Sequence, residues 1–391
     1  MIIFTSPNGS GAEAHFVRDR NVNQATSTAP KIHRYQCPGC SADLIFEPRD
    51  GCLSCPYCGR SEPIPASAAE VQERSYDEYL KLRPEQLAKI SENALEVQCT
   101  GCGTTVTFSP PQVAGDCPFC AAKIVAQPQV ADPMLAPEGV LPFKITQRQA
   151  SDAIKAWLAS RWFAPNALVQ LAKQELASSV YLPFWTYDAH TTTHYSGERG
   201  EYYWETESYV ETDSQGRSVT RTRQVRRTRW HPASGTVARW FDDILIAASK
   251  SVPPERLATL EPWDMAELKP YQPAYLAGHK AQRYQLELAD GFEHAKAIMA
   301  PVIESDARQD IGGDEQRLHQ IATAYSGITF KQLLMPVWIS AYRFQSRVYQ
   351  VLVNARTAEV QGERPYSPWK IVGFVLLLLF IGIVLFYLSQ Q

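Results

Sequence analysis

The feature that most constrains the fold of this chain is a cysteine pattern that occurs twice. Eight of the nine cysteines form two sets with the spacing C-x2-C-x14-C-x2-C, and the second set begins 62 residues after the first. The sets are Cys37, Cys40, Cys55 and Cys58, then Cys99, Cys102, Cys117 and Cys120. Further matches at the same offset include Gln36/Gln98, Phe46/Phe108 and Pro48/Pro110. The segment is therefore an internal duplication.

Two CxxC pairs at this spacing predict a closed site of four thiolates around one metal ion. A CxxC turn directs two sulfurs at the ion, and two such turns complete the tetrahedron that structural zinc prefers. Gly59 and Gly103 each follow a turn, where a positive φ is expected. We predict two structural zinc ions with no open coordination position for catalysis. The alternatives are disulfides, which a reducing cytoplasm disfavours, and iron–sulfur or redox chemistry.

The ninth cysteine, Cys52, has Ala114 at its matching position in the second copy. We interpret it as a spare thiol, with ligand exchange as the alternative.

A second constraint is the uncharged apolar run Ile371–Leu388, 18 residues long. As a helix it spans about 27 Å, close to the hydrocarbon thickness of a bilayer, and it has no polar face. We predict a transmembrane helix over 369–388 that anchors the chain by its tail. Arg364 and Lys370 precede it and no basic residue follows, which predicts that the large N-terminal part is cytoplasmic. The first thirty residues lack the pattern of a signal peptide.

These features predict an α+β protein with a defined order of segments. The order is a disordered tail at 1–30, a zinc ribbon at 31–62, a helical spacer at 63–95, a second zinc ribbon at 96–125, a Pro-rich linker at 126–138, an α+β domain at 139–366, and the transmembrane helix. The spacer is expected to hold two helices within 75–96, broken at Pro84.

The α+β domain is expected to be β-rich, because the chain is rich in aromatic residues. We predict a helix from Gln147 to Trp162, a second over Asn166–Ser178 and a long strand over 180–195. Helices near Gly291–Glu304 and Asp314–Ala324, followed by aromatic strand sequence at 333–354, repeat this layout. The domain is therefore expected to be pseudo-duplicated.

Residues 220–230, "TRTRQVRRTRW", carry five arginines, and residues 201–211 carry four glutamates. A turn over Asp213–Gly216 would fold the two segments into a charged hairpin, which we place at 198–231. With residue 213 facing 217, Glu207 faces Arg223 and Glu201 faces Arg229. A register two residues away would instead join Glu211 to Arg221 and Glu205 to Arg227. We predict this charge-paired hairpin in preference to a phosphate-binding stripe.

The overall charge gives little support to nucleic-acid binding. The formal net charge is −3, and residues 31–125 carry 9 Lys and Arg against 12 Asp and Glu. Four thiolates around zinc add a formal charge of about −2 at each site, and phosphate binding needs cations. A nucleic-acid-associated role is kept as an alternative.

Catalytic motifs are absent from the sequence, but three histidines form a second alternative. His190 and His194 share one face of a predicted strand, and with His231 they would make a third metal site of a metal-dependent enzyme. Packing or surface histidines are the preferred interpretation. The acidic residues Asp188, Asp242, Asp243 and Asp264 have no partner that the sequence identifies.

The two cysteine sets, the segments "LPF", "YLPFWTY", "MPVW" and "GERP", and the apolar helix together resemble a known family over residues 31–388. The chain resembles bacterial TFIIB-type zinc-ribbon membrane proteins of uncharacterised function, often labelled primosomal-helicase-like. Ala355 and Ala358 stand where that family has glycines in a hairpin turn. The resemblance implies the bacterial inner membrane and a scaffold in membrane-stress or flotillin-like systems.

The predicted function is a non-enzymatic, membrane-tethered adaptor. It would recruit a protein partner to the cytoplasmic face of the membrane, with two zinc ions as structural cofactors.

Overall fold

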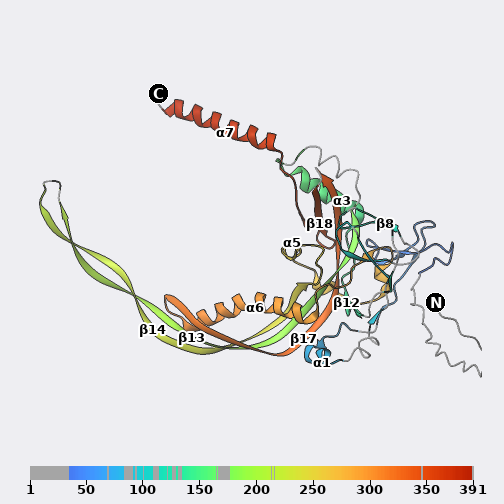
Figure 1. The fold of residues 1–391 in the computed structure, drawn as a ribbon, viewed down its shortest axis with the longest axis horizontal. Helices are drawn as coiled ribbons and strands as arrows, with labels where there is room; N and C mark the ends of the chain where they lie inside the picture. Colours follow the sequence, from blue (N-terminus) through green and yellow to red (C-terminus); the bar gives the residue numbers. More distant parts are fainter. Residues whose placement is uncertain are drawn as a thin grey trace, which may run out of the picture. The chain divides into compact units, whose positions relative to one another are not determined.

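A computed structural model of the chain describes residues 35–67, 70–82, 91–92, 95–99, 101–108, 114–120, 122–125, 129–130, 134–163, 165, 177–212, 214, 216–344 and 347–389. The fold is mixed α+β and strand-rich, as predicted, with two four-cysteine clusters and one apolar helix near the C-terminus (Figure 1).

The central sheet is built around two long strands. Strand β13 (Ser178–Thr212) lies between β14 (Ser218–Ala247) and β17 (Glu315–Phe344), antiparallel to both. On its far side β17 pairs with β18 (Arg347–Asn354), which pairs with β19 (Val360–Gly362). Strand β12 (Gly139–Val140) lies parallel to β17 and antiparallel to β15 (Lys269–Pro270). Strand β13 therefore continues well beyond the predicted 180–195.

Alternating side chains give this sheet two buried faces. Tyr181 contributes to one hydrophobic cluster, and its neighbours Val180 and Leu182 contribute to another. Helix α3 (Gln147–Ala159) covers the Tyr181 face through Ile154 and Leu158, and Thr146 forms a capping box with Gln149 at its start. This helix is the one predicted over 147–162. The short helix α5 (Pro254–Ala258) contributes Leu257 to the opposite face.

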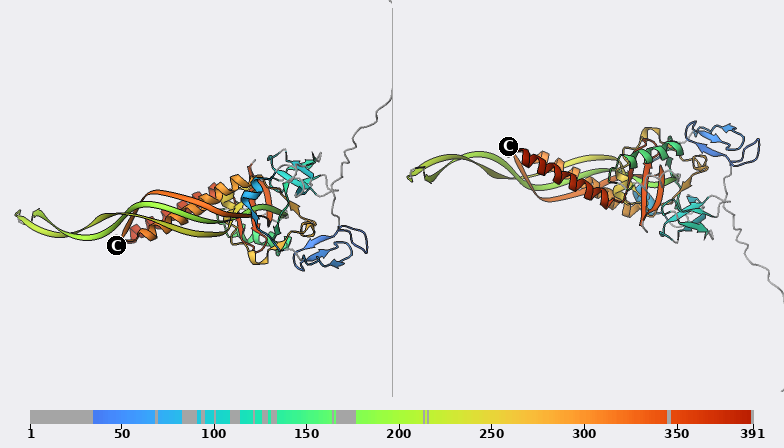
Figure 2. Two further views of the ribbon diagram at one scale, coloured as in Figure 1. Left: turned by 90° about the horizontal axis from the view of Figure 1, so that it is seen from below. Right: turned by 90° about the horizontal axis from the view of Figure 1, so that it is seen from above.

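Helix α6 (Leu288–Ile311) lies along the extended part of the sheet, as Figure 2 shows. Its buried residues recur every three or four positions: Leu288, Phe292, Ala295, Met299, Ile303, Ala307 and Ile311. At Gly291 a Cβ atom would stand 2.3 Å from the Tyr187 hydroxyl, so the close approach of helix and sheet requires glycine. The helix ends at Gly312, which has φ 66°.

An ionic cluster built on the buried Asp188 and Lys331 occupies the bulge where β13 shifts register against both neighbours. Lys331 Nζ lies 2.7 Å from Asp243 and 3.1 Å from Glu73, and the Asp188 carboxylate accepts from the Asp243 backbone N–H at 2.6 Å. Burial raises the pKa of Asp188. Asp188 and Asp243, which lacked an identifiable partner in the sequence, therefore belong to one structural cluster. Asp264 pairs with Arg356 at 2.9 Å.

The charged hairpin forms in the first predicted register. Glu207 faces Arg223 and Glu201 faces Arg229. It is longer than the predicted 198–231, since the ladder runs from Phe184↔Ala247 to Thr212↔Ser218.

The ion pairs of the other proposed register form as diagonal contacts. Arg221 lies 2.9 Å from Glu211, and Arg227 lies 2.5 Å from Glu205. Arg223, directly opposite Glu207, lies 3.1 Å from it. The remaining two arginines of the run, Arg226 and Arg229, lie over the Tyr202 and Tyr203 rings at 4.2 and 4.9 Å.

Several predicted helices are corrected. Asp314–Ala324 is not a helix, because residues from Glu315 onward pair with β13, so the predicted repeat of a helix pair fails. Residues 333–344 and 347–354 belong to the paired strands β17 and β18.

In the spacer, the first helix is α1 (Tyr76–Leu80), after β4 (Arg74–Ser75). The second predicted helix of the spacer is wrong where the structure describes it, because those residues form β5 (Ser91–Glu92) and the start of β6 (Leu95–Gln98). The rest of that helix lies outside the described residues, as does most of the helix predicted over 166–178. The predicted linker holds β10 (Gln129–Val130) and β11 (Met134–Leu135).

Smaller elements complete the described fold: two 3-10 turns, Met265–Glu267 and Pro273–Leu276, and the strand β16 (Lys280–Ala281), which pairs with β13.

The turn between β18 and β19 replaces the expected glycine geometry with alanine. Ala358 has φ 66°, the left-handed conformation that disfavours a Cβ atom, and its N–H donates to the Asn354 carbonyl at 3.0 Å. Ala355 is fully buried, and its carbonyl accepts from the N–H groups of Lys144 and Ile145. The turn therefore keeps the hairpin at the cost of local strain.

Helix α7 (Pro368–Ser389) matches the predicted span of 369–388. Among the described residues it is the one helix long and apolar enough to cross a membrane, and none of its apolar window is buried. Trp162 and Phe163, just after α3, contact its first turns through Phe374, with ring centroids 5.7 and 5.5 Å away. The Ser367 N–H donates to the Phe163 carbonyl at 2.8 Å. The start of α7 is thus joined to the folded body by aromatic contacts.

Candidate metal centres

The duplication is visible in the strands that carry the cysteines. In the first copy, β2 (Cys52–Ser54) pairs with β1 (Ile45–Glu47) and β3 (Ser61–Glu62). In the second, β8 (Ala114–Asp116) pairs with β9 (Lys123–Val125), and these two begin 62 residues after β2 and β3. Strand β7 (Thr105–Phe108) instead pairs with β6 and with β16 of the body. The second copy is therefore joined to the body through its backbone.

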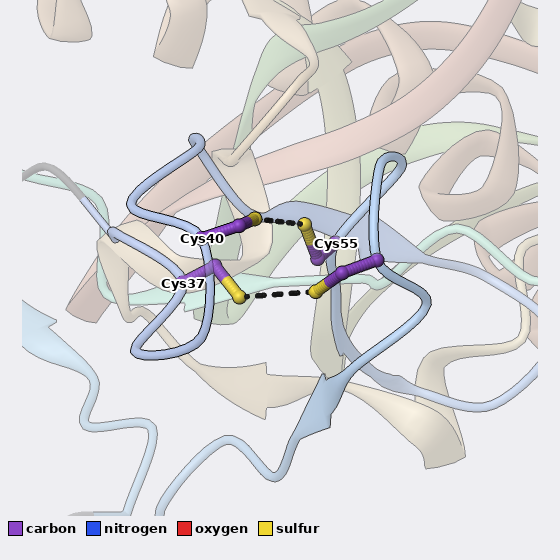
Figure 3. A group of neighbouring side chains, drawn as sticks. Cys37, Cys40 and Cys55 are labelled. Carbon is purple, nitrogen blue, oxygen red and sulfur yellow. Dashed lines mark hydrogen bonds between the residues drawn. The ribbon is translucent and has the colours of Figure 1, made fainter.

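Each set of four sulfurs converges on one point. In the first set Cys37 Sγ lies 3.4 Å from Cys58 Sγ, and Cys40 Sγ lies 3.4 Å from Cys55 Sγ. Figure 3 shows Cys37, Cys40 and Cys55 with their sulfurs turned toward one another. The corresponding distances in the second set are 3.6 Å (Cys99–Cys120) and 3.7 Å (Cys102–Cys117).

These separations test the metal prediction. A disulfide needs an S–S distance of about 2.05 Å, which none of these pairs approaches. A tetrahedron with Zn–S bonds of about 2.3 Å has edges of about 3.8 Å, close to the observed separations. All the ligand atoms of each set lie within 4.8 Å of one another. The donor sets therefore fit one ion each, and four thiolates are the set that structural zinc favours.

The first CxxC turn of each copy closes with the same backbone hydrogen bond. The Ser41 N–H donates to the Cys37 carbonyl and the Gly103 N–H to the Cys99 carbonyl, both at 2.8 Å. The φ values are 59° at Ser41 and 74° at Gly103, and Gly59, after the next turn, has 73°. The positive φ expected at the two glycines is confirmed.

Backbone N–H groups also prepare the sulfurs for metal binding. The N–H groups of Cys58 and Tyr57 donate to Cys55 Sγ and lower the pKa of this thiol to about 6. Other thiols are shifted upward in both sets. Although a backbone hydrogen bond with Ala42 opposes it, the hydrogen bond with Cys55 raises the pKa of Cys40 to about 12, and burial raises that of Cys120 to about 11. A metal ion must therefore displace protons from both sets as it binds.

The two ribbons pack on opposite faces of the central sheet. Cys37, Phe46 and Cys55 belong to the cluster that contains Tyr181. Cys99, Cys117, Phe119 and Cys120 belong to the cluster that contains Val180 and Leu182. Because successive side chains of β13 point to opposite faces, the duplicated module covers the sheet from both sides.

Tyr57 and Phe119, which occupy matching positions in the last CxxC turn of each copy, have opposite environments. Phe119 is 1% exposed, and its carbonyl accepts from Gln350 Nε2 on β18 at 2.7 Å. Tyr57 is 82% exposed. Sequence reasoning did not single out this pair. The 62-residue offset and the shared aromatic character identify the two positions, but only the fold shows which ring is buried.

The three candidate histidines do not assemble a site. Each histidine has a different neighbour. The His190 and Trp240 ring centroids are 4.1 Å apart, and His194 Nδ1 lies 2.8 Å from Thr236 Oγ1. His231 Nε2 lies 3.9 Å from a carboxylate oxygen of Glu201. Within the described residues, the groups of His, Cys, Asp and Glu close enough to hold a metal ion are the two cysteine sets. Cys52 lies on β2, outside the first set.

The fold and these sites define a class: a strand-rich α+β protein with two four-cysteine sites that could hold metal ions and one helix that could span a membrane. The chain is similar to the protein YdjG of Bacillus subtilis (strain 168), described as uncharacterized. The two are 24% identical over 359 residues, which cover 88% of this chain and 93% of YdjG. No family model matches the chain, and no solved structure matches it.

Proposed function

We propose that this protein is a non-enzymatic, membrane-tethered adaptor that recruits a protein partner through its first zinc ribbon. The observation that carries the proposal is the different environment of Tyr57 and Phe119. The second ribbon uses its aromatic residue to pack on the body, whereas the first presents the matching residue to solvent. An exposed aromatic ring on a rigid turn is a typical anchor of protein interfaces.

Rigidity of the first ribbon supports this role. Phe46 packs edge-on against Tyr275 at 5.5 Å, and its N–H donates to the Ala277 carbonyl at 2.8 Å. Four thiolates around one ion would hold the turn that bears Tyr57. A side chain held in this way loses little conformational freedom when a partner binds.

Tethering would occur through α7. Arg364 and Lys370 lie on the N-terminal side of the apolar window, the arrangement that favours a cytoplasmic body at the bacterial inner membrane. Trp162 and Trp369, both exposed near the start of α7, fit an interfacial aromatic belt. The resemblance to TFIIB-type zinc-ribbon membrane proteins supports a scaffold in membrane-stress or flotillin-like systems.

The test is crosslinked co-purification of the full-length protein from cells. Wild type is expected to recover discrete protein partners, Tyr57→Phe to retain them and Tyr57→Ala to lose them. Each preparation should bind two metal ions per chain, which verifies that the ribbon remains folded. Equal recovery with Tyr57→Ala would refute the recruiting role of this turn.

A truncation after residue 366 tests the tether separately. It is expected to leave the membrane fraction and to lose those partners that reside at the membrane. Recovery of the same partners by the truncated chain would remove the membrane from the proposal.

The nucleic-acid alternative is less well supported, because three of the five hairpin arginines are ion-paired and the others lie over tyrosine rings. A gel-shift titration at low salt decides it, since tight and steeply salt-dependent binding would favour that alternative.

A further inference from the structure

Past Gly200, β13 and β14 form a two-stranded β-ribbon, which is distinct from the zinc ribbons and is called the ribbon in this subsection. No other described strand pairs with it. Pairing of β13 with β17 ends at Gly200↔Glu315, whereas β13 and β14 remain paired from Glu201↔Arg229 to Thr212↔Ser218. These twelve rungs span about 40 Å at roughly 3.4 Å per residue. Figure 1 shows the two strands twisting around each other beyond the end of β17. An isolated two-stranded hairpin is marginally stable in water, so this ribbon would gain from a further strand.

Both edges of the ribbon are open to pairing. Among the described strands, β14 pairs with β13 alone, and β13 pairs with no second strand past Gly200. The Tyr202 N–H, next to that end, donates to the Asp314 carboxylate at 2.7 Å. Open edges present backbone N–H and C=O groups that another strand can bind. No proline interrupts 201–212 or 218–231. The ribbon also exposes large apolar side chains: Trp204 is 65% and Val210 68% exposed.

The two strands of the ribbon carry opposite charges. Residues 201–212 contain four glutamates and no basic residue, and residues 218–230 contain five arginines and no acidic residue. The register places all four glutamates on one face, together with Arg221, Arg223, Arg227 and Arg229. Like charges directly across a ladder repel, and opposite charges attract. Two acidic edges or two basic edges would therefore repel, whereas an acidic edge and a basic edge attract.

We propose that this ribbon is a self-association surface, on which the basic strand of one copy pairs with the acidic strand of a second copy. Two hairpins that point the same way place β14 of one beside β13 of the next in antiparallel orientation, the arrangement that already exists within each hairpin. Each row of arginines then lies between two rows of glutamates. Because each strand carries one sign of charge, the pairing of a basic strand with an acidic strand is favoured. Pairing of two acidic strands or of two basic strands is disfavoured.

The contact joins different surfaces of the two copies, so it generates a closed ring or an open row. Copies held in one membrane through the same helix share one orientation, which suits hairpins that point the same way. The surface is separate from Tyr57, so the self-association does not depend on the proposed recruiting role.

A charge-swapped hairpin separates association between copies from folding of the hairpin itself. The variant carries Glu205→Arg, Glu207→Arg and Glu211→Arg together with Arg221→Glu, Arg223→Glu and Arg227→Glu. It retains opposite charges within its own hairpin, so its ladder is expected to form. Wild type and variant, each full-length in detergent, are expected to form complexes of the same size by size-exclusion chromatography with light scattering.

Co-expression with two different affinity tags then tests pairing between copies. A wild-type hairpin beside a swapped hairpin sets arginine against arginine or glutamate against glutamate. Recovery of the mixed species is expected to be about tenfold lower than recovery of differently tagged wild-type copies. The discrimination should weaken at 1 M salt, where the Debye length falls to about 3 Å.

Three outcomes would overturn the proposal. The first is monomeric wild type at all concentrations, and the second is free mixing of wild type with the swapped variant. The third is loss of the wild-type complexes on nuclease treatment, which would show that nucleic acid bridges the arginines. Should the swapped variant not fold, two triple variants replace it. One carries only the three arginine-to-glutamate changes, and the other carries only the three glutamate-to-arginine changes. Each is expected to be monomeric alone and to associate when mixed, and failure of the mixture to associate would also overturn the proposal.

Discussion

His279 joins the first ribbon to the body and is buried among aromatic rings. It stacks on Phe143 with ring centroids 4.3 Å apart and meets Phe46 and Trp338 edge-on at 6.0 and 6.4 Å. Burial lowers the pKa of His279 to about 4, although a backbone hydrogen bond with Phe46 opposes the shift. In the unfolded chain the same imidazole titrates near 6.5.

This difference makes the free energy of unfolding depend on pH. Above pH 6.5 the imidazole is neutral in both states, and its burial costs nothing electrostatically. As the pH falls below 6.5, His279 binds a proton in the unfolded chain but stays neutral in the folded chain. The free energy of unfolding therefore decreases until the pH reaches about 4. Between pH 7.5 and 5.5 the expected loss is about 1.3 kcal/mol from this residue.

The assay is urea unfolding of the full-length, metal-loaded protein in detergent, followed by tryptophan fluorescence at the two pH values. His279→Phe keeps an aromatic ring but cannot titrate, so its stability should fall by about 1.3 kcal/mol less than that of wild type. Losses shared by both proteins, such as protonation of carboxylates, cancel in the comparison. Equal pH dependence in wild type and variant would refute the reasoning, because it would mean that His279 titrates alike in both states.

Three further changes have defined outcomes. Ala358→Gly should raise the free energy of unfolding by about 0.5–1 kcal/mol, because glycine relieves a left-handed φ at the cost of chain entropy; a decrease in denaturation experiments would contradict this. Phe119→Ala should lower the free energy of unfolding by about 3–5 kcal/mol, because the ring is buried. Tyr57→Ala should change it by less than about 0.5 kcal/mol, because that ring is exposed, and thermal unfolding measures both. Cys37→Ser should reduce bound metal from two ions per chain to one by mass spectrometry, and Cys52→Ser should leave both; the reverse pattern would reassign the ligands.

Local patterns were sufficient to predict the cysteine sets and a charge-paired hairpin, with two registers left open. A CxxC turn and its glycine determine their own backbone within a few residues. In the hairpin, the turn signal at 213–216 and the opposite charges of the two segments predict the pairing of the strands, and the structure adopts the register with Glu207 opposite Arg223. These features depend on neighbours in sequence, so no knowledge of the rest of the fold was needed.

Features that depend on contacts between residues distant in sequence could not be predicted from local patterns. Residues 314–324 have a mixed polar pattern that a helix could accommodate, but β13 provides a long edge, and pairing along it outweighs intrinsic propensity. The partners of Asp188 are distant in sequence, since Lys331 and Glu73 meet it only when the sheet closes. The burial of Phe119 and the exposure of Tyr57 likewise depend on which copy places this position in the hydrophobic cluster of the sheet.

The contact between Phe119 and Gln350 also has a consequence for synthesis of the chain. The two residues are 231 positions apart. At the usual 5–20 residues per second, a ribosome needs roughly ten to fifty seconds to make the intervening chain. Throughout that interval the cysteines of the second ribbon are available to metal, but the hydrophobic cluster that contains Phe119 is incomplete, because Leu352 belongs to it. Metal binding by the second ribbon can therefore precede folding of the α+β domain. A nascent chain in this state would expose hydrophobic surface that chaperones can bind.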